Sequence, residues 1–295
     1  MTTNPSHATG NGDTRVVHAA IDFGISNTDA VSVRNGERTF WTRESLGAPD
    51  QNVVRAVLAA GAITLDGLSA IAVTGGRHKM LPAWLGSCEV IPVPEVSAIG
   101  RGGQALALPD ASPATTSLLV VSAGSGTAVV SARGLQYAHI TGTGVGGGTL
   151  LGLGRLLLGT TDVHEIDAMA LRGDPNGVDL ALRDVVSSPI GSLPPDATAV
   201  NFGRLARLEA APSRDDLAAA LVTLIGQVIA VTAINAARAE RLEHVVVIGH
   251  MTDMPSFRRV LDQVGAYYGM QLMLPANGGY GTALGALLHH AGTNR

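Results

Sequence analysis

The sequence is poor in cysteine, lysine and charge, and each shortage excludes a class of protein. Cys88 is the only cysteine, so neither an intramolecular disulfide framework nor a multi-cysteine zinc site can form. Lys79 is the only lysine, and no GxxxxGK[ST] segment occurs, which excludes a P-loop. Charged residues make up 15% of the chain and the net charge is −4, so no basic footprint points to nucleic acid.

What the chain does have is length and apolar residues. Its 295 residues are 46% hydrophobic, which excludes disorder throughout and suggests about two domains or one large α/β unit. Residues 1–15 are polar and lack the apolar stretch of a signal peptide, so we expect a disordered tail there. Together with the single cysteine, this favours a protein of the reducing cytoplasm.

The longest uncharged run, Leu217–Ala237, has about the length of a membrane span. Thr223, Gln227 and Asn235 interrupt it, and Ser213 before it is a plausible helix N-cap. This pattern favours a helix buried inside a protein over one that faces lipid.

Short apolar strands alternate with helices, which indicates α/β layers. His18–Asp22 and Ala30–Val33 predict a hairpin around a polar turn, and Leu118–Ser122 with Thr127–Ala132 predict another about 100 residues later. The recurrence suggests two related halves, with Leu108–Thr116 as the boundary. Further helices are predicted at Asn52–Ala60, Leu150–Leu158 and Thr282–His289, and further strands at Ala70–Thr74, Glu89–Pro92 and Val245–Ile248.

Both hairpin turns carry residues suited to phosphate binding. An Asp at a strand end can hold hydrated Mg²⁺, while small residues in a tight turn present N–H groups to an anion. The same residue types are ordinary in turns, so each motif alone is weak. The candidates are Asp22, Gly24, Ser26, Asn27 and Thr28 in the first turn and Gly124, Ser125, Gly126 and Thr127 in the second.

A third segment, Gly142–Thr149, packs five glycines into seven residues directly ahead of a predicted helix. A helix N-terminus with exposed N–H groups is a ready anion site. A flexible linker is the alternative, but linkers are not usually placed between an apolar strand and an apolar helix. The segment therefore predicts phosphate or substrate binding.

Glu95 heads an apolar helix, where it is either an ordinary first-turn acid or a catalytic carboxylate. The nine histidines show no paired metal-ligand spacing. His139 and His250 are the two placed near candidate sites, with a solvated or capping role as the default for each.

Taken together, these motifs resemble the type II pantothenate kinases of the actin-like sugar kinase and heat-shock ATPase superfamily, from about Val17 to the end. The resemblance implies an α/β, two-lobed actin-like ATPase (ribonuclease H-like) fold with duplicated halves, divided into lobes at residues 16–112 and 113–295. It rests on the Asp22 hairpin, Glu95 with Ala98-Ile99-Gly100, Gly124–Thr127, Gly142–Thr149, Gly173–Asp179, Asn201-Phe202-Gly203, Val245–Gly249 and Pro275–Gly285.

The resemblance also implies a reaction, the ATP-dependent phosphorylation of pantothenate to 4'-phosphopantothenate at the start of coenzyme A biosynthesis. Glu95 would accept the proton of the attacking alcohol, and Asp22 would hold Mg²⁺. The helix over Leu217–Ala237 would form a homodimer. Nucleotide binding would fall to both hairpin turns and Gly249, and substrate binding to Ser125, His139, Gly142, Thr143, Gly144, Gly146, Gly147 and Gly148.

Four positions depart from the family pattern. Ile25 and Asp29 stand where family members usually carry Gly and Lys, and a carboxylate beside a triphosphate weakens its binding unless a cation compensates. His139 replaces an Arg, with the loss of a permanent charged fork, and Ala128 replaces a serine. Three readings stay open: an active pantothenate kinase, a kinase for another small alcohol or sugar, and a catalytically weak nucleotide-binding regulatory dimer.

Overall fold

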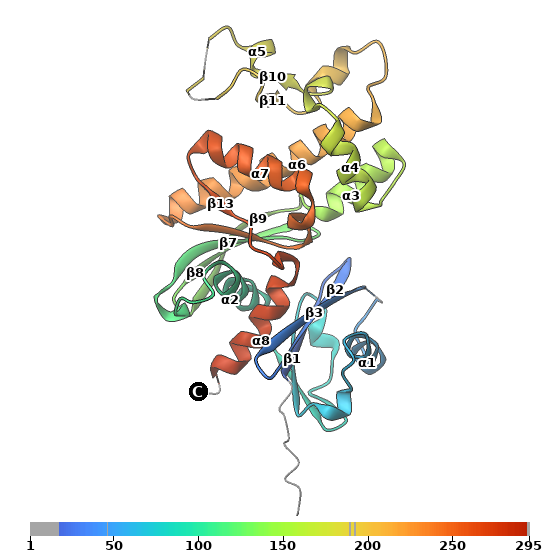
Figure 1. The fold of residues 1–295 in the computed structure, drawn as a ribbon, viewed down its shortest axis with the longest axis vertical. Coiled ribbons are helices and arrows are strands. Elements are labelled where there is room, and N and C mark those ends of the chain that lie inside the picture. Colours follow the sequence, from blue (N-terminus) through green and yellow to red (C-terminus); the bar gives the residue numbers. More distant parts are fainter. Residues whose placement is uncertain (1–17, 46, 189, 192, 294–295) are drawn as a thin grey trace, which may run out of the picture.

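The computed structural model describes residues 18–45, 47–188, 190–191 and 193–293. The tail predicted at residues 1–15 lies outside the described residues. Two sheets, each covered by helices, build two lobes that are stacked along the long axis of the molecule (Figure 1). We call them the N-terminal and the C-terminal lobe.

The sheet of the N-terminal lobe has the strand order β3-β2-β1-β4-β6-β5. The first three strands form an antiparallel meander, and β4 and β6 then add in parallel to β1. Asp50 caps the helix α1 through the Val53 N–H, as expected for an N-cap aspartate. The elements are β1 (His18–Phe23), β2 (Asn27–Arg34), β3 (Glu37–Glu44), α1 (Gln51–Ala60), β4 (Ala70–Thr74), β5 (Trp84–Leu85) and β6 (Cys88–Pro92).

The sheet of the C-terminal lobe, ordered β13-β12-β7-β8-β9, repeats this plan. An antiparallel meander again comes first, and β12 then pairs in parallel with its first strand. The predicted pair of hairpins and the duplicated halves are therefore both present. The strands are β7 (Ser117–Ala123), β8 (Thr127–Arg133), β9 (Gln136–Thr143), β12 (Val245–Ile248) and β13 (Leu272–Met273).

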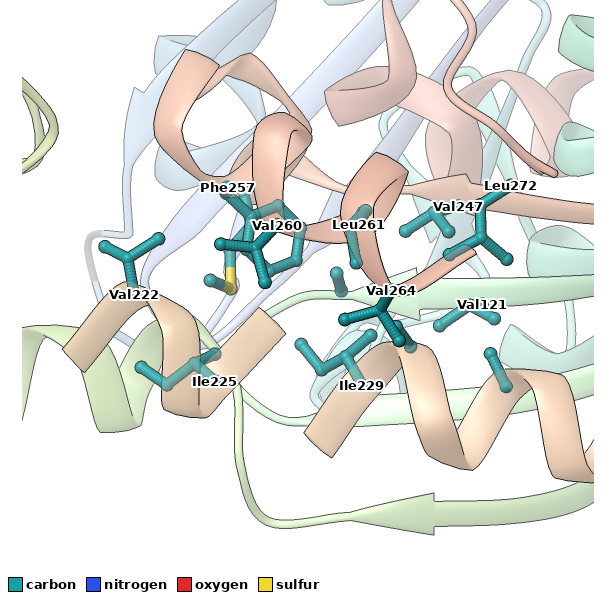
Figure 2. Close-up of a cluster of buried hydrophobic side chains, with 14 of the residues drawn as sticks. Val121, Val222, Ile225, Ile229, Val247, Phe257, Val260, Leu261, Val264 and Leu272 are labelled. Carbon is teal, nitrogen blue, oxygen red and sulfur yellow. The ribbon is translucent and has the colours of Figure 1, made fainter. Parts of the chain in front are cut away.

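The long apolar run forms α6 (Arg214–Glu240), which lies in the core of the C-terminal lobe. Its most apolar window is 67% buried, and Ser213 caps its first turn. Figure 2 shows Ile225 and Ile229 of α6 packed against Val260 and Val264 of α7 (Pro255–Tyr268), beside the sheet. The burial accounts for the absence of charge along the run.

Two helices each pack against the sheet of the other half of the chain. α2 (Glu95–Ala107), from the first half of the chain, packs Ile99 on the C-terminal sheet, while α8 (Gly281–Thr293) packs Leu284 on the N-terminal sheet. The two helices cross in direct contact (Figure 1). The chain passes from one sheet to the other at residues 108–116, between α2 and β7, and the lobe limits 16–112 and 113–295 stay a prediction.

The remaining elements surround α6. A small excursion projects from the end of the C-terminal lobe that lies away from α8 (Figure 1). The excursion contains β10 (Leu180–Ala181), α5 (Leu182–Val185) and β11 (Thr198–Val200). The neighbouring helices are α3 (Gly147–Leu158) and α4 (Val163–Arg172). Single 3₁₀ turns are found at Leu65–Gly67, His78–Met80, Pro113–Thr115, Pro175–Gly177, Gly203–Arg207, His250–Asp253 and Gly278–Tyr280.

Candidate active site

A cleft of about 510 Å³ lies where the turns of the two β-hairpins meet. Ser26 of the β1–β2 turn and Ser125 of the β7–β8 turn are joined by a hydrogen bond of 3.0 Å between their hydroxyls. One wall comes from the β1–β2 hairpin and Glu95, and the other from the β7–β8 hairpin, α3 and the segment after β12. Residues of both sheets therefore converge on one site.

Asp22 is the last but one residue of β1 and lines this cleft. It pairs with Asp29 on β2 and with Thr74 on β4, and Gly75 follows at φ +91°. A Cβ at Gly75 would lie 2.7 Å from Asp22 Oδ1 and 2.5 Å from the Phe23 carbonyl, so this glycine leaves room for the carboxylate. Burial, and then the charges of Asp29 and Glu95, raise the pKa of Asp22 to about 8, although His250 opposes the rise.

The surroundings of Asp22 suit a hard divalent cation. The available donors are oxygens, and the buried Thr74 Oγ1 has no hydrogen-bond partner among the described residues. The described residues contain no cluster of three His, Cys, Asp or Glu side chains that could hold a metal. Mg²⁺ commonly binds through one or two carboxylates, with phosphates and water completing its shell, so the residues present fit it.

Glu95 occupies the first turn of α2 and lines the cleft. Its side chain is exposed, and the structure gives it no hydrogen bond or ion pair with the other described residues. Its charge helps to raise the pKa of Asp22, which lines the same cleft. A solvent-facing carboxylate without a structural partner can accept a proton from a bound hydroxyl.

Two N–H groups of the glycine run are hydrogen-bonded inside the protein. The N–H groups of Gly147 and Gly148, at the start of α3, donate to the carbonyls of Gly124 (2.8 Å) and Ser125 (2.9 Å). Thr127 Oγ1 donates to the Val145 carbonyl over 2.8 Å. These N–H groups therefore hold the second hairpin turn in place and are not directed at an anion.

His250 begins the turn after β12 and faces Asp29 across the cleft. Its Nε2 lies 2.9 Å from Asp29 Oδ1, and its Nδ1 lies 2.9 Å from Asp253 Oδ2. Burial alone would lower the pKa of His250, but its hydrogen bonds to Asp253 and Asp29 and their charges outweigh burial and raise the pKa to about 10.

The structure brings together most of the residues predicted from sequence. Thr28 is buried, with its hydroxyl 3.3 Å from that of Ser45, and His139 is exposed on the edge strand β9; neither lines the cleft. The same holds for Gly142, Gly144, Gly146 and Gly148. The predicted residues that line the cleft are Asp22, Gly24, Ser26, Asn27, Glu95, Gly124, Ser125, Gly126, Thr127, Thr143, Gly147 and Gly249. Their roles stay predictions.

Sequence reasoning missed the apolar wall of the cleft and the part played by His250. The apolar wall is formed by Leu150, Leu151, Val163, Met251 and Met254. They come from α3, α4 and the turn after β12, and nothing in their local spacing marks them as neighbours. The one available signal was the position of His250 directly after Gly249.

Two lobes of repeated topology around a cleft between hairpin turns define a protein of the actin-like ATPase and sugar kinase fold. Solved structures agree. The activator of 2-hydroxyisocaproyl-CoA dehydratase from Clostridium difficile, with bound ADPNP, has a TM-score of 0.62 at 16% identity and covers 95% of this chain and 96% of its own. A ROK family glucokinase from Streptomyces griseus, in complex with glucose and AMPPNP, has a TM-score of 0.54 at 13% identity. It covers 92% of this chain and 98% of its own.

Sequence similarity identifies the family. Residues 105–289 match the family described as Fumble. Type II pantothenate kinases from Oceanobacillus iheyensis and Bacillus cereus G9842 are 31% and 28% identical over 226 residues, which is 76% of this chain and 84% and 82% of theirs. The chain belongs to the type II pantothenate kinase family and is an ATP-dependent kinase.

Proposed function

We propose that the chain transfers the γ-phosphoryl group of Mg·ATP to the primary hydroxyl of pantothenate. The hydroxyl oxygen attacks the γ-phosphorus, the bond from that phosphorus to the β,γ-bridging oxygen breaks, and ADP leaves with that oxygen. The proton of the hydroxyl passes to Glu95. The observation that carries the proposal is the Glu95 carboxylate, which has no partner among the described residues and lines the same cleft as the two hairpin turns.

Residues of this chain supply positioning and electrostatics. The turns at Ser26 and Ser125 would bind the phosphates, and the apolar wall around Met251 and Met254 would take the base. Asp22 would hold Mg²⁺, which offsets the negative charge of the triphosphate when bound. Because the reaction consumes ATP, we place the enzyme in the cytoplasm, acting on a small molecule without nucleic acid or membrane as partner.

We also propose a homodimer formed through α6. Leu217, Leu224, Val228 and Val231 follow one another at intervals of seven, four and three residues and are each only partly buried. This spacing places them on one face of the helix. A partly exposed apolar stripe on an otherwise buried helix suits contact with the same stripe of a second copy.

The test is ADP release with Mg·ATP and a panel of pantothenate, pantetheine, pantoate and N-acetylhexosamines. We expect turnover on pantothenate, reduced by roughly 10²- to 10⁴-fold in Glu95→Gln because the proton acceptor is lost. Glu89→Gln, which removes an exposed carboxylate from β6 outside the cleft, is the matched control and should leave the rate unchanged.

Turnover on another alcohol of the panel but not on pantothenate would overturn the proposed substrate while retaining the kinase. An unchanged rate in Glu95→Gln would overturn the role of Glu95. Bound ATP without turnover on any acceptor would favour the nucleotide-binding regulatory dimer.

A further inference from the structure

One ion pair crosses the cleft and joins the two lobes. Asp29 lies on β2 of the N-terminal lobe, and its side chain is only 10% exposed. His250 belongs to the C-terminal lobe, 221 positions further along the chain, and its Nε2 lies 2.9 Å from Asp29 Oδ1. Such a contact exists only while the lobes are held close together.

The geometry around the ring requires a charged histidine. Its two nitrogens each lie 2.9 Å from a carboxylate oxygen, Asp29 Oδ1 on one side and Asp253 Oδ2 on the other. An ionised carboxylate only accepts hydrogen bonds, so both nitrogens must donate, and only the imidazolium has two N–H groups. The contact across the cleft is therefore an ion pair and not a neutral hydrogen bond.

Both ends of the pair are held in place. Thr42 on β3 donates its hydroxyl proton to Asp29 Oδ1 over 2.6 Å. The His250 ring meets the ring of Tyr280 edge-on, with centroids 5.4 Å apart, and Tyr280 stacks at 5.1 Å on Phe40 of β3. Tyr280 precedes α8, so this aromatic contact supports the ion pair from a separate segment.

The position of the pair sets it apart from an ordinary surface contact, which contributes little to stability. Asp29 and His250 both line the cleft, next to the hairpin turns joined by Ser26 and Ser125. Among the described residues that line the cleft, His250 is the only Lys, Arg or His, whereas Asp22, Asp29 and Glu95 are acidic. Without the pair, Asp29 would present an uncompensated carboxylate to the phosphates of ATP.

We propose that Asp29 and His250 form an ionic clasp that holds the lobes closed and so aligns the two hairpin turns for Mg·ATP. Both ring N–H groups of His250 are already bonded to carboxylates, so it acts by closure and charge neutralisation and does not donate to the nucleotide. Asp29 and His250 are thus positioning residues. The kinetic consequence of the clasp rests on the proposed function, while its structural consequence does not.

The test compares Asp29→Asn, His250→Gln and the double variant with the unsubstituted protein. Asp253→Asn is the matched control, because it removes a carboxylate from the same ring and leaves both residues of the contact across the cleft in place. Lobe separation is measured by double electron–electron resonance between two spin labels. They are attached at Ala59→Cys on α1 and Asp262→Cys on α7, both exposed positions. Cys88, the native cysteine, is fully buried and does not compete for label.

We expect each single variant to widen the distance distribution between labels in the absence of nucleotide. The dissociation constant of ATP should rise roughly tenfold, the factor that corresponds to a coupling of about 1.4 kcal/mol. The double variant should bind ATP no more weakly than either single variant, since both substitutions break the same interaction. Asp253→Asn should keep the narrow distribution. If Asp29→Asn fails to fold, His250→Gln tests the same contact from a less buried position.

An unchanged distance distribution in His250→Gln would overturn the clasp. The clasp would also be overturned if the increases in the dissociation constant of ATP in the two single variants multiplied in the double variant. A KM for Mg·ATP that rises with little change in kcat would support it in the working enzyme. Because distances and ATP affinity need no acceptor, a failure of pantothenate turnover would overturn the proposed function and leave this test intact.

Discussion

At the scale of single residues, His250 makes the stability of the protein depend on pH. Its pKa is raised from 6.5 to about 10, so its contribution is complete below about pH 6.5 and is lost as the pH rises through 10. We expect His250→Gln to lower the free energy of unfolding by roughly 1–3 kcal/mol at pH 6 and by progressively less toward pH 10. Urea unfolding of both proteins at pH 6, 8 and 10 measures this, and a difference that grows with pH contradicts it.

The same residues show what could not be predicted from the sequence. Judged by the family pattern alone, Asp29 replaces a lysine and so removes a cation beside the triphosphate. Its partner lies 221 positions away and belongs to the other lobe, so no local pattern connects the two. The two hairpin turns that carry Ser26 and Ser125 were predictable, because short polar segments rich in glycine and serine separate pairs of apolar strands there.

At the scale of elements, the crossing of α2 and α8 depends on glycine. A Cβ at Gly102 would overlap the Gly281 carbonyl, and one at Gly285 would overlap the Ala98 carbonyl. We expect Gly285→Ala to lower the melting temperature by several degrees, since the two helices must move apart. Gly152→Ala on α3 is the control: a Cβ there meets nothing within 4 Å, so the higher helix propensity of alanine should stabilise the protein by about 0.5–1 kcal/mol.

Calorimetry of both variants decides the point, and a Gly285→Ala variant as stable as Gly152→Ala would show that the crossing is not tight.

The hairpins and most helices follow from local apolar periodicity, which is why they were predictable. The exchange of α2 and α8 between the lobes was not, because a helix's own pattern shows that it has an apolar face but not which sheet covers that face.

At the scale of the whole molecule, the proposed dimer makes a prediction of its own. Val228→Arg places a charge on the partly exposed stripe of α6, and we expect it to convert a dimer into a monomer because a buried, unpaired charge is costly. Leu156→Arg, at a side chain 77% exposed on α3, is the control and should remain dimeric. Light scattering coupled to size-exclusion chromatography gives both masses, and an unsubstituted protein that is monomeric contradicts the proposal.

As a whole, the two-lobed kinase is proposed to phosphorylate pantothenate with Glu95 as proton acceptor. The most direct measurement is a single turnover of γ-³²P-labelled ATP with pantothenate, followed by separation of the products. We expect label in a phosphate monoester of pantothenate, formed rapidly by the unsubstituted protein and roughly 10²- to 10⁴-fold more slowly by Glu95→Gln. Label that stays in ATP, or that reaches pantothenate at the same rate in both proteins, would contradict it.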